Sequence, residues 1–406
     1  MAELTNNMHV MELSAFQALI PTDLASDPDY LARRFLTLAA SAPGDDLRGG
    51  SGYVTKVANC YGESFALKSM LEVRESDPQE RFRIQAGRRQ AFYEEYQAHR
   101  AVTGVPGIPQ LYGLGTLAGK PVMLMDWVEG QTLAKARPLL PVAEDGRGHP
   151  GGLVAGIGLA VVRTLLLARG HAPGFVHRDV SARNIMLRGT AEVIRQMAGE
   201  QDVSACLIDM GSSAISQADR TSFTMGSDIW RYGTPEYAAP EMLVRDADIG
   251  GMRASASIDV YALCSVLYEL YAGYAPYNMQ DNRQALKMDA YNMKRQFAPI
   301  SIALHDIADR DLVELIMAGI VSEQERRIGL EELYEGLLSY LGIPGVSARQ
   351  LLETGAQVGR PVPGQLDPLD AERGGGRLNG PLPERLTRTM DAPPGRLRRG
   401  LRELFG

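Results

Sequence analysis

The fold is decided by one stretch of sequence, His177-Arg178-Asp179-Val180-Ser181-Ala182-Arg183-Asn184. The apolar pair Phe175-Val176 precedes it, and the apolar run Cys206-Leu207-Ile208 precedes a second charged residue, Asp209. Short apolar runs that end at a charged residue are typical of buried strands that fix a polar tip. The pattern therefore predicts two carboxylates and an amide held in defined positions.

Three further motifs occur in order around this stretch. Ala66-Leu67-Lys68 lies upstream, and Asp209-Met210-Gly211 and Gly233-Thr234-Pro235-Glu236-Tyr237-Ala238-Ala239-Pro240-Glu241 lie downstream. Together the four motifs resemble those of a eukaryotic-type (Hanks-type) serine/threonine protein kinase, and the Ala, Gly and Arg content hints at a bacterial source. The resemblance implies an α+β, two-lobed protein kinase fold, with a small antiparallel-sheet lobe containing one main helix and a larger, mostly helical lobe.

The resemblance also gives each reactive side chain a role. Asp179 would orient the substrate hydroxyl and accept its proton, and Lys68 would pair with the α- and β-phosphates of ATP. Asn184 and Asp209 would hold magnesium, which proteins usually bind through one or two carboxylates plus substrate phosphates. These roles suit a loose transition state, in which the protein mainly positions the partners and neutralises charge. The implied cofactors are ATP and Mg, and the implied partner is a protein substrate.

The catalytic stretch departs from the serine/threonine pattern at Ser181, where such kinases usually carry a lysine near the γ-phosphate. Arg183 resembles the arginine of receptor tyrosine kinase loops, and it would supply the missing charge because arginine stays protonated and binds oxygens in pairs. Thr234 resembles the threonine that bonds the catalytic aspartate in serine/threonine kinases. We therefore expect serine and threonine to be the acceptors.

Two other functions stay open. A pseudokinase scaffold would bind nucleotide and partners without transfer, but the intact Lys68, Asp179, Asn184 and Asp209 favour an active enzyme. Small-molecule kinases share a similar HxDxxxxN loop, but they lack the segment 233–241.

Nucleotide contacts are predicted in two places. The segment 47–54 follows the glycine-rich pattern GxGxxGxV except at Leu47, and it predicts contacts with ATP at Gly49, Gly50, Ser51, Gly52 and Val54. The segment 121–130 resembles the strand and hinge that join the lobes, with Met125 as gatekeeper. Backbone groups of Asp126, Trp127 and Val128 would then face the adenine.

A helix predicted over residues 80–102 would carry the glutamate that orients Lys68. The spacing to the downstream segment 106–112 favours Glu95, with Glu94 as the alternative.

Two charged residues resemble structural braces of the family. Asp259 resembles the buried aspartate that bonds the catalytic loop, and Arg327 resembles the arginine that pairs with Glu241. A buried charge is unfavourable unless it is paired, so we expect loss of either residue to impair folding first.

The segment between Asp209 and Glu241 is expected to regulate activity. A phosphate adds roughly −1.5 to −2 charge at neutral pH, and it would order this segment through bonds to Arg178. We therefore expect self-phosphorylation at one or more of four candidate hydroxyls: Thr221, Ser222, Thr224 and Ser227.

The chain divides into four parts. Residues 1–44 are predicted as an N-terminal helical extension, in which Asp27-Pro28-Asp29 opens a helix that carries Leu31, Phe35 and Leu38 on one face. Residues 45–125 form the small lobe, and residues 126–342 form the hinge and large lobe, with an inserted loop at 134–152. Residues 343–406 contain 11 Gly and 8 Pro, which predicts a disordered Pro/Gly/Arg-rich tail. Its end carries a short basic amphipathic pattern that would dock on a membrane or partner, although Gly400 and the short length favour a frayed, solvated end. The pattern consists of Leu397, Leu401, Leu404 and Phe405 among Arg396, Arg398, Arg399 and Arg402.

Composition limits the remaining possibilities. The tail holds 10 Arg and 7 acidic residues and therefore carries a net charge of +3. Because the whole chain has a net charge of −7, the other 342 residues carry −10, which argues against nonspecific nucleic-acid binding. Cys60, Cys206 and Cys264 lack metal spacing and are expected to be reduced core residues. We expect no secretory leader, and the apolar run 153–168, interrupted by Arg163, indicates a buried helix. A cytoplasmic location is expected, with delivery into another cell left open; the sequence does not indicate the oligomeric state.

Overall fold

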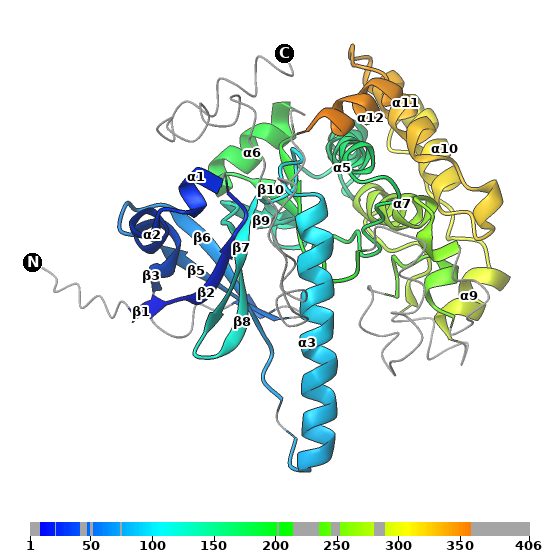
Figure 1. Ribbon diagram of the computed structural model, residues 1–406. Helices are drawn as coiled ribbons and strands as arrows, with labels where there is room; N and C mark the ends of the chain where they lie inside the picture. Colours follow the sequence, from blue (N-terminus) through cyan, green and yellow to red (C-terminus); the bar gives the residue numbers. More distant parts are fainter. Residues whose placement is uncertain are drawn as a thin grey trace, which may run out of the picture.

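The computed structural model describes residues 9–20, 22–40, 47–48, 52–73, 75–200, 203–213, 235–244, 252–279 and 289–358. In this part of the chain a sheet-rich small lobe stands beside a helical large lobe (Figure 1). The architecture is the α+β, two-lobed one that the sequence predicts.

The small lobe is built on an eight-stranded antiparallel sheet. The strand order is β1-β3-β5-β6-β8-β7-β2, with β4 beside β5. The strands are β1 (His9–Glu12), β2 (Ser14–Ala18), β3 (Thr37–Ala40), β4 (Leu47–Arg48), β5 (Gly52–Ala58), β6 (Ser64–Met70), β7 (Leu111–Leu117) and β8 (Lys120–Asp126). The β5–β6 hairpin places Val54 opposite Lys68, so the glycine-rich strand and the lysine strand are neighbours.

The N-terminal extension is not the helical segment predicted for residues 1–44. Its described part has three short helical pieces, α1 (Thr22–Ala25), α2 (Pro28–Leu31) and the π-turn η1 (Ala32–Leu36), and it adds three strands to the sheet. Leu13 alone separates β1 from β2, yet these strands pair with β3 and β7 at opposite ends of the strand order. The extension therefore brings the two edges of the sheet together.

Alternation of buried residues explains why the predicted helix stops early. Asp27 caps α2 as expected, because its side chain accepts the N–H groups of the next turn. Beyond Leu36, however, Leu38 and Ala40 are buried at a spacing of two, which is the period of a strand. Phe35 is fully buried in this extension, and its ring contacts the rings of Phe16, Tyr30, Phe65 and Tyr112.

The main helix of the small lobe, α3 (Pro78–Ala101), matches the helix predicted over residues 80–102. Asp77 caps it by accepting the Gln79 N–H. Its second half packs on the sheet through Phe92 and Tyr96, whereas its first half projects away from the body (Figure 1).

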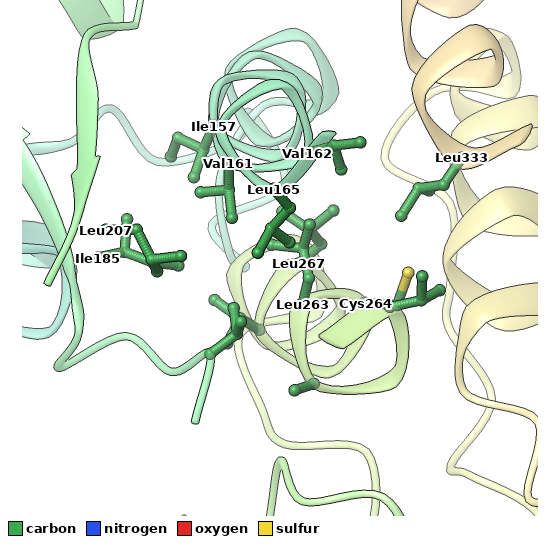
Figure 2. Close-up of a cluster of buried hydrophobic side chains, with 14 of the residues drawn as sticks. Ile157, Val161, Val162, Leu165, Ile185, Leu207, Leu263, Cys264, Leu267 and Leu333 are labelled. Atoms are coloured by element: carbon green, nitrogen blue, oxygen red, sulfur yellow. The ribbon is translucent and has the colours of Figure 1, made fainter. Parts of the chain in front are cut away.

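The large lobe is arranged around α5 (Gly151–His171). Figure 2 shows Val161 and Leu165 of α5 packed between Leu207 of a three-stranded sheet and Leu267 of α7. The other elements of this lobe are β9 (Gly130–Thr132), α4 (Leu133–Ala136), η2 (Arg137–Leu139), β10 (Ile185–Arg188), α6 (Ala191–Glu200), β11 (Ala205–Leu207), η5 (Pro240–Met242), η6 (Met252–Ala254), α7 (Ser257–Ala272), α9 (Ala290–Gln296), η7 (Ile307–Asp309), α10 (Arg310–Gly319), η8 (Gln324–Arg326), α11 (Leu330–Leu341) and α12 (Ala348–Gln357).

Among the described helices, α5 is long and apolar enough to cross a membrane by length and composition. However, 78% of its most apolar 18-residue stretch is buried inside the protein. This burial confirms the predicted core helix. Two of the cysteines expected in the core, Cys206 and Cys264, are buried, whereas Cys60 is exposed because it lies in the turn between β5 and β6.

The tail predicted to be disordered from residue 343 begins with an ordered helix. Ser347 and Gln350 form a capping box at the start of α12, which buries Leu351 against the large lobe. Glycines permit a close approach to α5: a Cβ on Gly170 would lie 2.1 Å from the Leu352 carbonyl oxygen, and one on Gly355 would lie 2.2 Å from the Leu167 oxygen. The predicted amphipathic end at 397–405 lies outside the described residues.

Candidate active site

Lys68 lies at the centre of the site, between two carboxylates from distant parts of the chain. Its ammonium pairs with Glu95 of α3 and lies 2.9 Å from Asp209 Oδ1, two residues after β11. The glutamate that pairs with Lys68 is thus Glu95, the favoured choice. Burial lowers the pKa of Lys68, but the charges of Asp209 and Glu95 outweigh it and raise that pKa. The lysine therefore stays protonated at neutral pH.

The same ion pair keeps Asp209 charged. Burial alone would raise the pKa of Asp209, but Lys68 and the Gly211 N–H, which donates to Oδ1 at 3.2 Å, lower it to about 2. Asp209 is therefore a carboxylate throughout the physiological range.

Asp259 of α7 binds the backbone of the catalytic stretch, residues 177–184. Its two carboxylate oxygens accept the backbone N–H groups of His177 and Arg178, each at 2.8 Å. Asp259 is 2% exposed, and burial raises its pKa to about 6. The predicted brace is confirmed, and it fixes the two residues that lead into Asp179.

Asn184 lies directly before β10 and contacts Asp179. Its Nδ2 donates to the Asp179 carbonyl at 2.9 Å and to Asp179 Oδ2 at 2.8 Å, so its amide oxygen is the atom that could bind a metal ion. Burial and the nearby charge of Asp209 raise the pKa of Asp179 to about 7. A buried cluster with this excess of negative charge suits a divalent cation, since Asp209 and Asn184 supply oxygens that magnesium prefers.

Arg178 and Asp209 both adopt left-handed backbone conformations, with φ of 67° and 66°. Such values are uncommon outside glycine and cluster at active sites, where the surrounding structure enforces them. Sequence reasoning missed this feature, because no residue type announces it.

The described ends of the glycine-rich segment lie on two paired strands. Leu47 and Arg48 of β4 pair with Val54 and Tyr53 of β5, while Gly49, Gly50 and Ser51 lie outside the described residues. A Cβ on Gly52 would lie 2.5 Å from the Ser69 carbonyl oxygen and 3.4 Å from Lys68 Cε. Glycine is therefore required where β5 passes the lysine.

The hinge prediction needs one correction. The N–H of Asp126 donates to the Gln110 carbonyl at 2.8 Å, and its carboxylate accepts from Gln110 N and from the Tyr112 hydroxyl. This N–H is therefore engaged inside the small lobe and does not serve the adenine. The Asp126 carbonyl and the backbone of Val128 stay predicted contacts.

The segment between Asp209 and Glu241, here called the activation segment, is attached to the large lobe at its end. Arg327 Nη1 lies 2.7 Å from Glu241 Oε1, as predicted, and both side chains are buried. Tyr237 donates its hydroxyl hydrogen to Glu269 of α7. The regulatory candidates Thr221, Ser222, Thr224 and Ser227 lie outside the described residues, and so does Thr234.

Arg253 connects this segment to the catalytic stretch. Its carbonyl accepts from Arg178 Nε at 3.0 Å, and its own Nε donates to the Glu241 carbonyl at 3.1 Å. Arg183 is exposed, and its charge acts to lower the pKa of Asp179, against the larger effect of burial. Sequence reasoning missed Arg253, because an arginine outside every motif usually indicates a solvated surface.

Comparison with known proteins agrees with this geometry. The model of the protein kinase domain matches residues 48–337. The serine/threonine-protein kinase PkaB of Streptomyces coelicolor is 36% identical over 111 residues, which cover 27% of this chain and 23% of the relative. The DNA damage-responsive serine/threonine-protein kinase RqkA of Deinococcus radiodurans is 28% identical over 272 residues, 66% of this chain and 35% of the relative.

The serine/threonine-protein kinase Pkn1 of Myxococcus xanthus is 25% identical over 241 residues, 59% of this chain and 30% of the relative. The matched regions thus span between 23% and 35% of the length of these three relatives. Because the domain match runs through both lobes, from Arg48 before the glycine-rich strand to Leu337 beyond Arg327, the chain belongs to the protein kinase family.

Proposed function

We propose that this protein transfers the γ-phosphate of ATP to serine and threonine hydroxyls of proteins. The observation that carries the proposal is the contact of Lys68 with both Glu95 and Asp209. A protein kinase needs this lysine and this aspartate together, because the lysine binds the phosphates and the aspartate binds their metal ion. The names of the relatives support serine and threonine as acceptors.

The chain's own groups can perform the positioning that the reaction requires. Lys68, oriented by Glu95, binds the nonreacting phosphates and leaves the γ-phosphoryl group exposed to the acceptor. Asp179 receives the hydroxyl of the substrate and orients it toward the γ-phosphorus of ATP. It takes the hydroxyl proton as the new oxygen–phosphorus bond forms and the bond from the γ-phosphorus to the bridging oxygen of the leaving ADP breaks. Asn184 holds the Asp179 carboxylate in place through the bond from Nδ2.

Asp209 and Asn184 would hold magnesium, and Lys68 with the backbone near Gly52 would hold the phosphates of ATP. When bound, magnesium supplies positive charge that offsets the charge on the phosphate oxygens. Protein kinases in general use both cofactors. In this chain the donor set fits them, because the protonated Lys68 lies 2.9 Å from the charged Asp209, and Asp209 acts on Asp179, which Asn184 contacts.

The proposal is tested by incubating the purified protein with ATP labelled in the γ-phosphate and a generic protein substrate. We expect label on the substrate, and mass spectra in which phosphoserine and phosphothreonine dominate. A pseudokinase scaffold would bind nucleotide but transfer no label. Spectra dominated by phosphotyrosine would contradict the assigned acceptors while leaving the kinase activity in place.

We also propose that the enzyme phosphorylates its own activation segment. Arg178 supports this proposal, since its Nε donates to the carbonyl of Arg253, and Arg253 in turn donates to the Glu241 carbonyl at the end of the segment. A phosphate on Thr221, Ser222, Thr224 or Ser227 would order the segment by charge-assisted bonds. The purified protein should carry phosphate there, and phosphatase treatment should lower its activity. An equally active treated enzyme would contradict this switch, and so would an Arg178→Ala variant that responds to phosphatase as the parent does.

A further inference from the structure

Lys294 of α9 is a fully buried lysine that no motif of the sequence includes. It is 0% exposed, and its Nζ donates to the Glu236 carbonyl at 2.8 Å and to the Ala238 carbonyl at 2.6 Å. The ammonium also lies 4.9 Å from the centroid of the Tyr261 ring and 5.6 Å from that of Tyr277. Two carbonyls and two aromatic rings thus replace the water that an exposed ammonium would bind.

The other buried residues of α9 are apolar. Met293 and Ala290 of the same helix pack with Tyr277 and Met279 in a small apolar cluster. Burial lowers the pKa of Lys294 to about 7, against the attraction of Glu236 and Glu241, so the charge is held at a free-energy cost. Removing the ammonium would leave the carbonyls of Glu236 and Ala238 without this donor, so its loss acts directly on the backbone of residues 236–238.

The carbonyls held by Lys294 belong to the end of the activation segment and lie on either side of Tyr237. The Glu236 carboxylate accepts N–H groups from Tyr277 at 3.2 Å and from Met279 at 3.0 Å. Residues 236–238 are therefore held by three parts of the large lobe. These are Lys294 of α9, the backbone of residues 277–279 before α9, and Glu269 of α7, which binds the Tyr237 hydroxyl. Lys294 binds the backbone carbonyls on both sides of Tyr237.

This backbone is also linked to the catalytic stretch. The carbonyl of Glu241, three residues beyond Ala238, accepts a hydrogen bond from Arg253 Nε. The carbonyl of Arg253 in turn accepts one from Arg178, which lies beside Asp179 in the sequence. The resemblance to protein kinases implies that Ala239-Pro240-Glu241 closes the platform on which a peptide substrate lies. A shift of residues 236–238, which lead directly into this tripeptide, would therefore disturb the platform beside the catalytic aspartate. The site of ATP, by contrast, is built from Lys68, Glu95 and Asp209, none of which contacts Lys294.

We propose that Lys294 is a positioning residue for the peptide substrate, which sets the backbone of residues 236–238 against which the peptide lies. This inference rests on the proposed protein kinase function. The proposal predicts that loss of Lys294 weakens binding of the peptide and leaves binding of ATP unchanged. A general loss of stability would weaken both.

The test uses the full chain and a serine-containing peptide selected on a peptide array as a substrate of the parent. Lys294→Met removes the ammonium and keeps the apolar stem, while Arg295→Met, one residue on and exposed, is the matched control. We expect the KM for the peptide to rise roughly tenfold or more in Lys294→Met, as for the loss of a charged hydrogen-bond donor to buried carbonyls, with the KM for ATP unchanged. Lys294→Arg, which keeps a charged donor, should recover part of the peptide KM.

Each outcome decides between the alternatives. A parent that phosphorylates no peptide contradicts the proposed function itself. An active parent whose Lys294→Met variant keeps the peptide KM, or raises both KM values equally, overturns the role of Lys294. A Lys294→Met variant that fails to fold, as judged by its thermal transition, shows that the ammonium holds the fold instead of the substrate surface, and this also overturns the proposal.

Discussion

Lys68 and Asp209 are 141 residues apart in the sequence, yet Lys68 Nζ lies 2.9 Å from Asp209 Oδ1. Their contact joins the sheet of the small lobe to the segment after β11 in the large lobe. The two groups that would hold the phosphates and their metal ion are therefore prearranged, because each fixes the charge of the other.

Lys68→Met should lower kcat/KM for ATP by a factor on the order of a hundred or more, because it removes the cation that binds the phosphates. Lys56→Met is the matched control, since Lys56 lies on the adjacent strand with an exposed ion pair to Glu129. Steady-state rates at varied ATP concentration check this prediction. Equal losses in the two variants would contradict the role of Lys68.

Asp259→Ala should lower the free energy of unfolding by roughly 2 to 5 kcal/mol, because it leaves the buried N–H groups of His177 and Arg178 without their acceptor. Urea unfolding of parent and variant measures the difference. Unchanged stability, combined with lost activity, would show that Asp259 acts in the chemistry and not as a brace.

His99 should make stability depend on pH. It is buried, its Nε2 lies 2.7 Å from the Pro109 carbonyl oxygen, and burial lowers its pKa from 6.5 to about 4. Between these values the unfolded chain binds more protons at this residue than the folded chain does, so the contribution of His99 to stability falls as pH falls from about 6.5 to 4. The decrease from one such histidine is on the order of 3 kcal/mol.

Urea unfolding between pH 7.5 and 4.5 measures this effect in the parent and in His99→Gln. Relative to the parent, the variant should lose less stability on acidification. The other buried groups titrate in both proteins: burial lowers the pKa of His177 to about 4, and it raises the pKa of Glu95 and of Asp179 to about 7. Parallel curves for the two proteins would contradict the assignment to His99.

Gly355→Ala should detach α12 from α5, because a methyl group cannot fit 2.2 Å from the Leu167 carbonyl oxygen. We expect faster proteolytic cleavage near residues 343–358, and a free energy of unfolding lower by roughly 1 to 3 kcal/mol. The control is Gly199→Ala in α6, where an added Cβ meets nothing within 4 Å. Equal cleavage of both variants would show that α12 does not need this close approach.

Much of the candidate site could be predicted because its residues carry chemistry in recognisable spacings. Lys68, Asp179, Asn184 and Asp209 lie together as the motifs imply, and Glu95 is placed by the lysine that it faces. The braces Asp259 and Arg327 were predictable for the same reason, since a buried charge requires a specific partner.

The rest depends on tertiary packing, which leaves a weaker pattern in the sequence. β1 and β2 are too short to predict alone, and they are strands because they pair with β3 and β7. The composition of the whole tail hides α12, whose capping box occupies only a few residues. Lys294 and Arg253 contact carbonyl groups of the backbone, and such partners have no side-chain signature.

Phosphoryl transfer by Asp179→Asn tests the central claim most directly. Asparagine keeps the size of the side chain but cannot accept a proton from the substrate hydroxyl. We predict that the variant binds ATP with the affinity of the parent, measured by calorimetry, and transfers labelled phosphate to a protein substrate slower by a factor on the order of a thousand. A variant that binds ATP and transfers phosphate at the rate of the parent would contradict the account.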